Sequence, residues 1–248
     1  MDRTTLIVAA VLFLATLVRS TLGFGEALIA VPLLALLIPV TVAAPVAALV
    51  SITVAAVVVV QDWRHIQIRS AARLIVSTLF GIPLGLLLLT RVPEPMVKAM
   101  LAIIIIAFSL QAMRAKRRRV ASDGVAWLFG FAAGVLGGAY GMNGPPLALY
   151  GSLRGWSPGE FRATLQGYFL PASAGGMLGY WMVGLWTPSV THFYLRSLPA
   201  VIVAIVVGRA VNQRMSARRF SVAVYSGLIV VGAVLLAQAA MSRTLTVL

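Results

Sequence analysis

Two glycine-containing breaks interrupt the apolar sequence of this chain, and each begins a stretch that could bind an ion. The first break is Gly23–Glu26 and the second is Gly141–Pro146. Inside a membrane, such broken backbone is tolerated only where it faces protein or a water-filled cavity. A matched pair of breaks, one in each half of a chain, is the best sequence indication of a transporter's substrate site.

A helix that starts at such a break presents unpaired amides and about half a positive charge. Two helix starts aimed at one point would bind a small anion without a metal. Pro145 loses only an amide that would be free anyway, and Asn143 adds a side chain that can donate or accept a hydrogen bond. The alternative is that the glycines serve close helix packing, which is common in membranes. The predicted substrate-binding residues are Gly23, Phe24, Gly25, Glu26, Tyr140, Gly141, Asn143, Gly144, Pro145, Arg162 and Gln166.

Three ionisable residues near the breaks, Arg19, Glu26 and Arg162, are predicted to couple or gate transport. A charge within a membrane is costly and is by default a functional hypothesis. Glu26 could carry a coupling proton, cap its own helix or pair with Arg19. Arg162 could attract or gate an anion, or it could extend to the interface beside Glu160. Gln166 lies one turn deeper on the face of Arg162, which favours the functional interpretation.

The composition is that of a membrane protein. The chain has 248 residues, of which 60% are hydrophobic and 10% charged, and its mean hydropathy is +0.99. A soluble globular protein would have roughly a quarter of its residues charged. The absence of cysteine excludes disulfides and thiolate ligands. No histidine and carboxylate cluster and no Ser/His/Asp set is evident, so we expect no metal, no cofactor and no enzymatic activity.

The apolar runs predict an all-α polytopic protein of 8 to 10 segments. We expect two inverted repeats of about five helical segments, each with a broken or hairpin helix, over residues 1–114 and 123–248, joined by a basic cytoplasmic linker at 115–122. Thr41 and Ser157 are predicted to cap matching helices. The expected segments are 4–22, 26–38, 41–61, 68–90 and 94–113 in the first half, and 124–139, 145–153, 158–186, 189–211 and 217–240 in the second.

The net charge of +14, from 20 Lys and Arg against 6 Asp and Glu, sets the expected orientation. Basic residues gather within 64–73, 114–119 and 209–219, which the positive-inside rule places in the cytoplasm beside anionic lipids. An odd number of segments in each half then inverts the second half and puts both termini outside. Nucleic-acid binding is a weaker interpretation, because no aromatic residues interleave with these basic stretches.

The sequence resembles the sulfite exporter family of the TauE/SafE type over nearly its whole length. The likeness lies in GFGEALIAVPLL at 23–34, GGAYGMNGPPLALY at 137–150 and RGWSPGEFRATLQGYF at 154–169. It implies a bacterial inner-membrane transporter that carries sulfite or organosulfonates, usually outward. Asn143 stands where many relatives have glycine, so the substrate could differ. The family motifs imply roles for Gly23, Gly25, Asn143, Gly144, Pro145, Pro146 and Arg162.

These observations together predict a secondary transporter of small anions, most simply an exporter of sulfite or an organosulfonate. It would work by alternating access, with the anion held at half-helix N-termini, and a proton is the candidate coupling ion. The expected partners are a small sulfur-containing anion and membrane lipids, and not nucleic acid. The small-residue faces would suit either internal packing or a homodimer. An anion channel or a non-transporting membrane scaffold remains the alternative.

Overall fold

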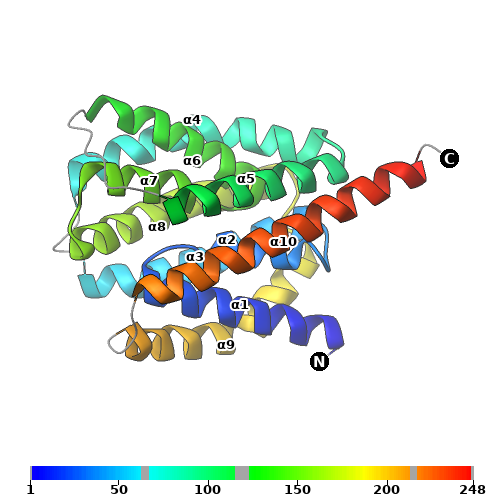
Figure 1. Cartoon of the computed structure of the whole chain (residues 1–248), viewed down its shortest axis with the longest axis horizontal. Coiled ribbons are helices and arrows are strands. Elements are labelled where there is room, and N and C mark those ends of the chain that lie inside the picture. Colours follow the sequence, from blue (N-terminus) through cyan, green and yellow to red (C-terminus); the bar gives the residue numbers. More distant parts are fainter. Residues whose placement is uncertain (1, 63–66, 115–122, 213–216, 247–248) are drawn as a thin grey trace.

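A computed structural model describes residues 2–62, 67–114, 123–212 and 217–246 of the chain. Over these residues the protein is all-helical, with ten α-helices and one short 3-10 helix (Figure 1), which confirms the predicted fold class. The expected basic linker at 115–122 lies outside the described residues. The first five helices are α1 (Arg3–Leu22), α2 (Glu26–Leu34), α3 (Val40–Asp62), α4 (Ile68–Arg91) and α5 (Glu94–Arg114). After the 3-10 helix at Asp123–Val125 come α6 (Ala126–Tyr140), α7 (Gly144–Arg154), α8 (Pro158–Met182), α9 (Pro188–Asn212) and α10 (Ala217–Thr246).

Local sequence signals account for several helix ends. Ser157 caps α8 by accepting from the Glu160 amide, and Glu160 reaches back in a capping box, as predicted for Ser157. Thr41 is not an N-cap, because α3 already begins at Val40. The helix α2 ends at Leu34 rather than at Ile38, and hydrogen-bonded turns lead from there to Pro39. Ile38 precedes Pro39, and a residue in this position avoids the helical conformation, so no single helix runs from α2 into α3.

Six helices are long and apolar enough to cross a membrane among the described residues. Large apolar side chains cover their outer surface, including Ile68, Phe80 and Val206, which are 67–76% exposed. Exposed apolar surface on this scale marks a lipid or protein contact. The chain is therefore a multi-pass membrane protein. The six candidate spans are Arg3–Thr21, Val40–Val59, Ile68–Arg91, Glu94–Arg114, Pro188–Gly208 and Val224–Met241.

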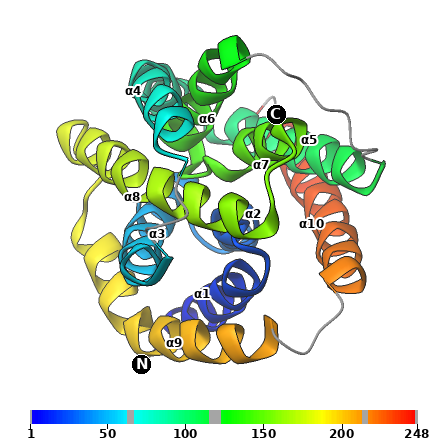
Figure 2. The same cartoon turned by 90° about the vertical axis from the view of Figure 1, so that its left-hand side faces the viewer.

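The two halves exchange packing partners in a symmetrical way. The helix α4 of the first half packs on α6, and its counterpart α9 packs on α1. The counterparts α3 and α8 pack on each other, as do α5 and α10 (Figure 2). This exchange is what two repeats related by a twofold axis require. The inverted orientation of the repeats and their boundaries stay predictions.

Small residues bring α4 and α6 into direct backbone contact. A Cβ built on Gly81 would lie 3.0 Å from the Cα of Gly134, and one on Gly138 would lie 2.9 Å from the amide nitrogen of Leu86. Such spacing leaves no room for any side chain and is typical of helix pairs in membranes. These glycines therefore serve packing inside one chain. The homodimer stays a prediction.

The start of α1 and the end of α10 lie at one end of the molecule, on the right in Figure 1, and α10 begins at the opposite end. The start of α10 adjoins the basic stretch at 209–219. Which side faces the cytoplasm stays a prediction.

Candidate functional site

The glycines of the two breaks have backbone conformations that other residues avoid. Gly23 and Gly25 have φ values of 86° and 99°, and Gly141 has a φ of 64°. Glycine enters this left-handed region at no steric cost. Gly23 ends α1 and Gly25 starts α2, while Gly141 ends α6 shortly before α7 begins. The glycines therefore permit two sharp helix–helix corners within the bundle.

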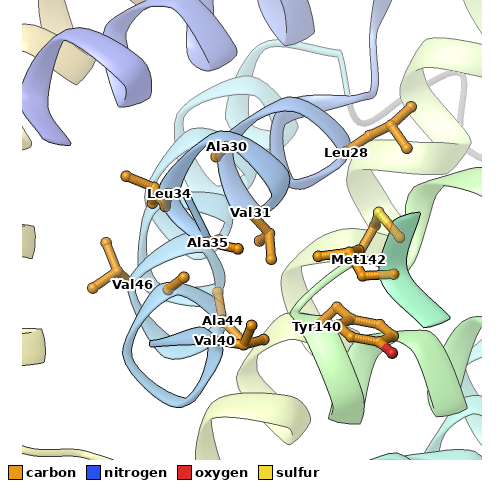
Figure 3. Packing of buried hydrophobic residues seen from close by; sticks show 14 of the residues in the cluster. Leu28, Ala30, Val31, Leu34, Ala35, Val40, Ala44, Val46, Tyr140 and Met142 are labelled. Atoms are coloured by element: carbon orange, nitrogen blue, oxygen red, sulfur yellow. The ribbon is translucent and has the colours of Figure 1, made fainter. Parts of the chain in front are cut away.

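The two corners meet although they lie far apart in the sequence. A Cβ built on Gly144 would lie 3.9 Å from the amide nitrogen of Gly25 and 3.7 Å from the ring of Phe24. Apolar packing supports this meeting, because Leu28 of α2 and Met142 of the second corner belong to one buried hydrophobic cluster (Figure 3). The starts of α2 and α7 are thereby brought to one place.

A small cavity lies where the corners meet. The centre of a water molecule can occupy about 20 Å³ of it, which is room for one or two waters. Both corners, the end of α1 and the middles of α3 and α8 form its wall. The lining residues are Arg19, Gly25, Glu26, Ala27, Leu28, Ser51, Gly141, Asn143, Gly144, Phe169 and Ser173.

Arg19 is a buried cation on the wall of this cavity, with 2% of its surface exposed. Its Nη1 donates to Oε2 of Glu26 at 2.5 Å and to the hydroxyl of Ser51 at 2.8 Å. Its guanidinium also lies 4.8 Å from the ring centre of Phe169, a cation–π contact. Glu26 is equally buried, so an ion pair is held away from water at the start of α2. Among the three interpretations of Glu26, the structure shows the pair with Arg19.

Gln166 joins the cation to the first corner. Nη2 of Arg19 donates to its side-chain oxygen at 2.7 Å, and its side-chain nitrogen donates to the carbonyl of Gly23 at 2.9 Å. The hydroxyl of Ser173, also on α8, donates to that of Ser51 at 3.1 Å. Side chains from both halves thus fix the orientation of Arg19.

Comparison with known proteins identifies the family of the chain. The sequence model described as Sulfite exporter TauE/SafE matches residues 8–235, which include both corners and every residue of the cavity wall. The chain belongs to the sulfite exporter TauE/SafE family. No curated protein and no solved structure gave a match. The TauE/SafE family comprises membrane transporters of sulfite or related anions.

Six residues predicted for the TauE/SafE site lie together on the cavity wall: Gly25, Glu26, Gly141, Asn143, Gly144 and the predicted coupling residue Arg19. Asn143 is 6% exposed, and its side chain contacts the hydroxyl of Tyr168. Gly23 and Gln166 do not line the cavity but lie next to it. Gln166 accepts a hydrogen bond from Arg19 and donates one to the carbonyl of Gly23.

The other predicted residues do not line the cavity. Tyr140 donates its hydroxyl to the carbonyl of Val97 on α5. Phe24 covers Gly144 from the far side, and Pro145 is buried in the first turn of α7. The stem of Arg162 packs on Gly23, where a Cβ would lie 2.8 Å from its Cγ. Arg162 is only partly buried, so it stands beside the site rather than in it.

Five lining residues were not predicted: Ala27 and Leu28, which follow Glu26 in α2, and Ser51, Phe169 and Ser173. Each of the last three lies in a long apolar helix away from the breaks, so nothing in the sequence distinguishes it from residues that pack the bundle. A hydroxyl within an apolar run is the one available signal, and it is weak. Among the described residues, no group of three or more His, Cys, Asp or Glu could hold a metal ion.

Proposed function

We propose that this TauE/SafE protein is a secondary transporter that exports sulfite or an organosulfonate across the bacterial inner membrane. The observation that carries the proposal is the meeting of two helix starts, Glu26 of α2 and Gly144 of α7, at one buried cavity with an arginine on its wall. Both helix starts and the guanidinium favour negative charge. The bidentate geometry of arginine suits the oxygens of a sulfite or sulfonate group.

We propose alternating access as the mechanism. The cavity is too small for a sulfite ion, whose four heavy atoms need more space than one or two waters. The described conformation is therefore a closed one, and the wall must move for the anion to enter or leave. Rocking of one half against the other would open the cavity to each side in turn, as in transporters built from repeats.

Binding by purified protein tests the substrate class. Sulfite, thiosulfate, sulfoacetate, sulfate and a simple carboxylate are compared by calorimetry, and uptake of the ions that bind is then measured in proteoliposomes. We expect binding of sulfite or a sulfonate, and flux that saturates and exchanges. No anion-dependent heat or flux for any of these ions would overturn the proposal, and conductance without saturation or exchange would indicate a channel.

Replacement of Asn143 tests the location of the site. We expect Asn143→Leu to reduce binding at least about tenfold, since the larger apolar side chain removes a polar group from the cavity wall. Leu178→Asn, on the exposed face of α8, serves as the control and should bind normally. Unchanged binding by Asn143→Leu would place the site elsewhere.

The proposed orientation can be tested by labelling, because the chain has no cysteine of its own. A single cysteine placed at position 116 of the linker is expected to react only from the cytoplasm. A cysteine at position 2 is expected to react from outside. The reverse result would invert the proposed orientation.

A further inference from the structure

The cavity wall carries one positive and one negative side chain, and they cancel each other. Arg19 and Glu26 are each 2% exposed and form an ion pair with Nη1 and Oε2 at 2.5 Å. Among the described lining residues they are the only charged ones. The carboxylate of Glu26 thus already occupies the guanidinium face that a transported anion would use.

Each partner of this pair also has unused hydrogen-bonding capacity. Nε of Arg19 and Oε1 of Glu26 are buried and have no hydrogen-bond partner. A buried donor or acceptor without a partner is costly, and such groups are rare in folded proteins. No group of the described residues uses either atom, so the ion pair can accept a further partner without losing another hydrogen bond.

We propose that the transported anion displaces the Glu26 carboxylate from Arg19 and that Glu26 takes up one proton in the same step. This inference deepens the proposed function and depends on it. The carboxylate becomes a carboxylic acid with a proton (H⁺) taken from the aqueous phase to which the site is open, and the anion takes its place beside the guanidinium. The summed charge of Arg19, Glu26 and one monovalent anion is then zero, as it was for the ion pair alone.

Charge balance favours this exchange over simple addition. With Glu26 ionised, a monovalent anion would bring the three groups to a net charge of −1 in a site shielded from water, where unbalanced charge is costly. Glu26 in the first turn of α2 places its own negative charge beside the amide end of that helix, so this end offsets the added charge only in part. The start of α7 compensates in part.

No other charge on the wall could take over the role of Glu26. The helices α1, α3, α5, α7 and α10 pack against α2. Within the described residues, Arg19 is the only charged or titratable side chain that they bring to the cavity. The helix α3 contributes Ser51, α8 contributes Ser173, and Asn143 precedes α7. The proton uptake is therefore assigned to Glu26.

The size of the cavity leads to the same conclusion. In the described conformation it holds one or two waters, which is less than a sulfonate or sulfite group needs. Movement of the Glu26 carboxylate away from Arg19 would free space for the anion directly beside the guanidinium. Release of the pair and widening of the site are thus one event.

Binding of methanesulfonate and of sulfite to the wild-type protein is the first test. Methanesulfonate keeps one negative charge at all relevant pH values, so its binding reports protons taken up by the protein alone. Calorimetry in two buffers of different ionisation enthalpy counts these protons. We expect about one proton per anion at neutral pH, and a Kd that rises about tenfold per pH unit once Glu26 is ionised in the empty site.

Two variants locate the effect. Glu26→Gln keeps the size of the side chain, and we expect it to bind methanesulfonate with a Kd independent of pH and without proton uptake. In proteoliposomes it should still exchange anions. It should fail to concentrate them on the more alkaline side of a pH gradient, which is where a carrier that moves the anion together with a proton would accumulate them. Glu94→Gln, which breaks the surface ion pair with Lys98, is the matched control and should behave as wild type.

The outcomes separate the two proposals. Binding with no proton uptake by the wild-type protein would overturn the role of Glu26 and leave the proposed function in place. Proton uptake that persists in a folded Glu26→Gln variant would also overturn it. If neither anion binds to the wild-type protein at any pH, the proposed function itself fails. The wild-type measurements decide the matter even if Glu26→Gln does not fold.

Discussion

Gln166 donates its side-chain amide to the backbone carbonyl of Gly23 at 2.9 Å, so the middle of α8 holds the first glycine corner in place. The same side chain accepts from Arg19 at 2.7 Å. One residue of the second half thus fixes both the backbone at the end of α1 and the cation on the cavity wall. The contact joins residues 143 positions apart.

Replacement of this residue should affect both stability and transport. Gln166→Leu leaves the Gly23 carbonyl and one guanidinium nitrogen without a partner, which costs about 1–3 kcal/mol for each buried group. We expect a lower melting temperature in detergent and sulfite flux reduced at least about tenfold. Gln238→Leu, exposed on α10 and outside the cavity wall, is the control and should leave sulfite flux unchanged. Normal flux in Gln166→Leu would show that Arg19 need not be held by α8.

The conformation of Gly25 can be tested apart from its space. Nothing lies within 4 Å of a Cβ built on Gly25, so alanine would be strained only by its φ of 99°. The left-handed conformation costs an alanine about 1–2 kcal/mol. We expect Gly25→Ala to reduce anion binding, because relaxation of the backbone would turn the first amides of α2 away from the cavity.

Gly184 provides a matched control for Gly25. It lies in the turn after α8, has a φ of 76°, and likewise has nothing within 4 Å of a built Cβ. Gly184→Ala should therefore lose similar stability yet bind the anion normally. Equal binding losses in both variants would mean that general destabilisation, and not the geometry of the corner, is responsible.

The packing of α4 on α6 leads to a third prediction. A Cβ on Gly81 would lie 2.9 Å from the amide nitrogen of Val135 and 3.0 Å from the Cα of Gly134. Gly81→Ala must force the helices apart, and overpacking of this kind costs about 1–3 kcal/mol. Gly176→Ala on α8 meets nothing within 4 Å and should gain about 0.5–1 kcal/mol from its helical position. Thermal unfolding in detergent should therefore give shifts of opposite sign.

The sequence predicts those features that depend on neighbouring residues. The C-terminal end of α1 follows from Gly23, and the start of α8 follows from the Ser157 cap. The hydrogen bonds at both positions join residues three or four positions apart. The apolar runs predict the long helices because a membrane admits little else. The glycine breaks were visible for the same reason, since helix-breaking residues are conspicuous in apolar sequence.

The site could be predicted only in part, because its contacts join distant segments. Arg19 meets Gln166 across 147 positions, and Ser51 meets Ser173 across 122. No local pattern encodes such pairs. The sequence also could not choose among the roles of Glu26, since a cap, a partner of Arg19 and a proton carrier all require a carboxylate at the same position. Only the packing of α3 and α8 around Arg19 shows that the pair forms.

Phe24 separates the cavity from a second, largely apolar pocket, which leads to a final prediction. Its ring covers Gly144 on one side and meets the ring of Phe161 edge-on at 5.9 Å. Phe24, Phe161, Phe108 and Tyr225 line the second pocket, which lies near the last turn of α5. Because the basic linker follows α5, we expect this pocket to lead to the cytoplasm.

Phe24→Ala should join the two spaces and weaken the barrier between them. Loss of a buried phenyl ring costs about 3–5 kcal/mol where the site cannot collapse, so the melting temperature should fall as well. We expect sulfite to leak down its gradient without exchange, because the anion could then reach the cavity while the opposite side is open. Phe80→Ala, on the exposed face of α4, removes the same side chain without touching either space and should transport normally. Retention of strict exchange in a folded Phe24→Ala variant would show that the barrier lies elsewhere, and Phe24 would then serve only to pack the corner at Gly144.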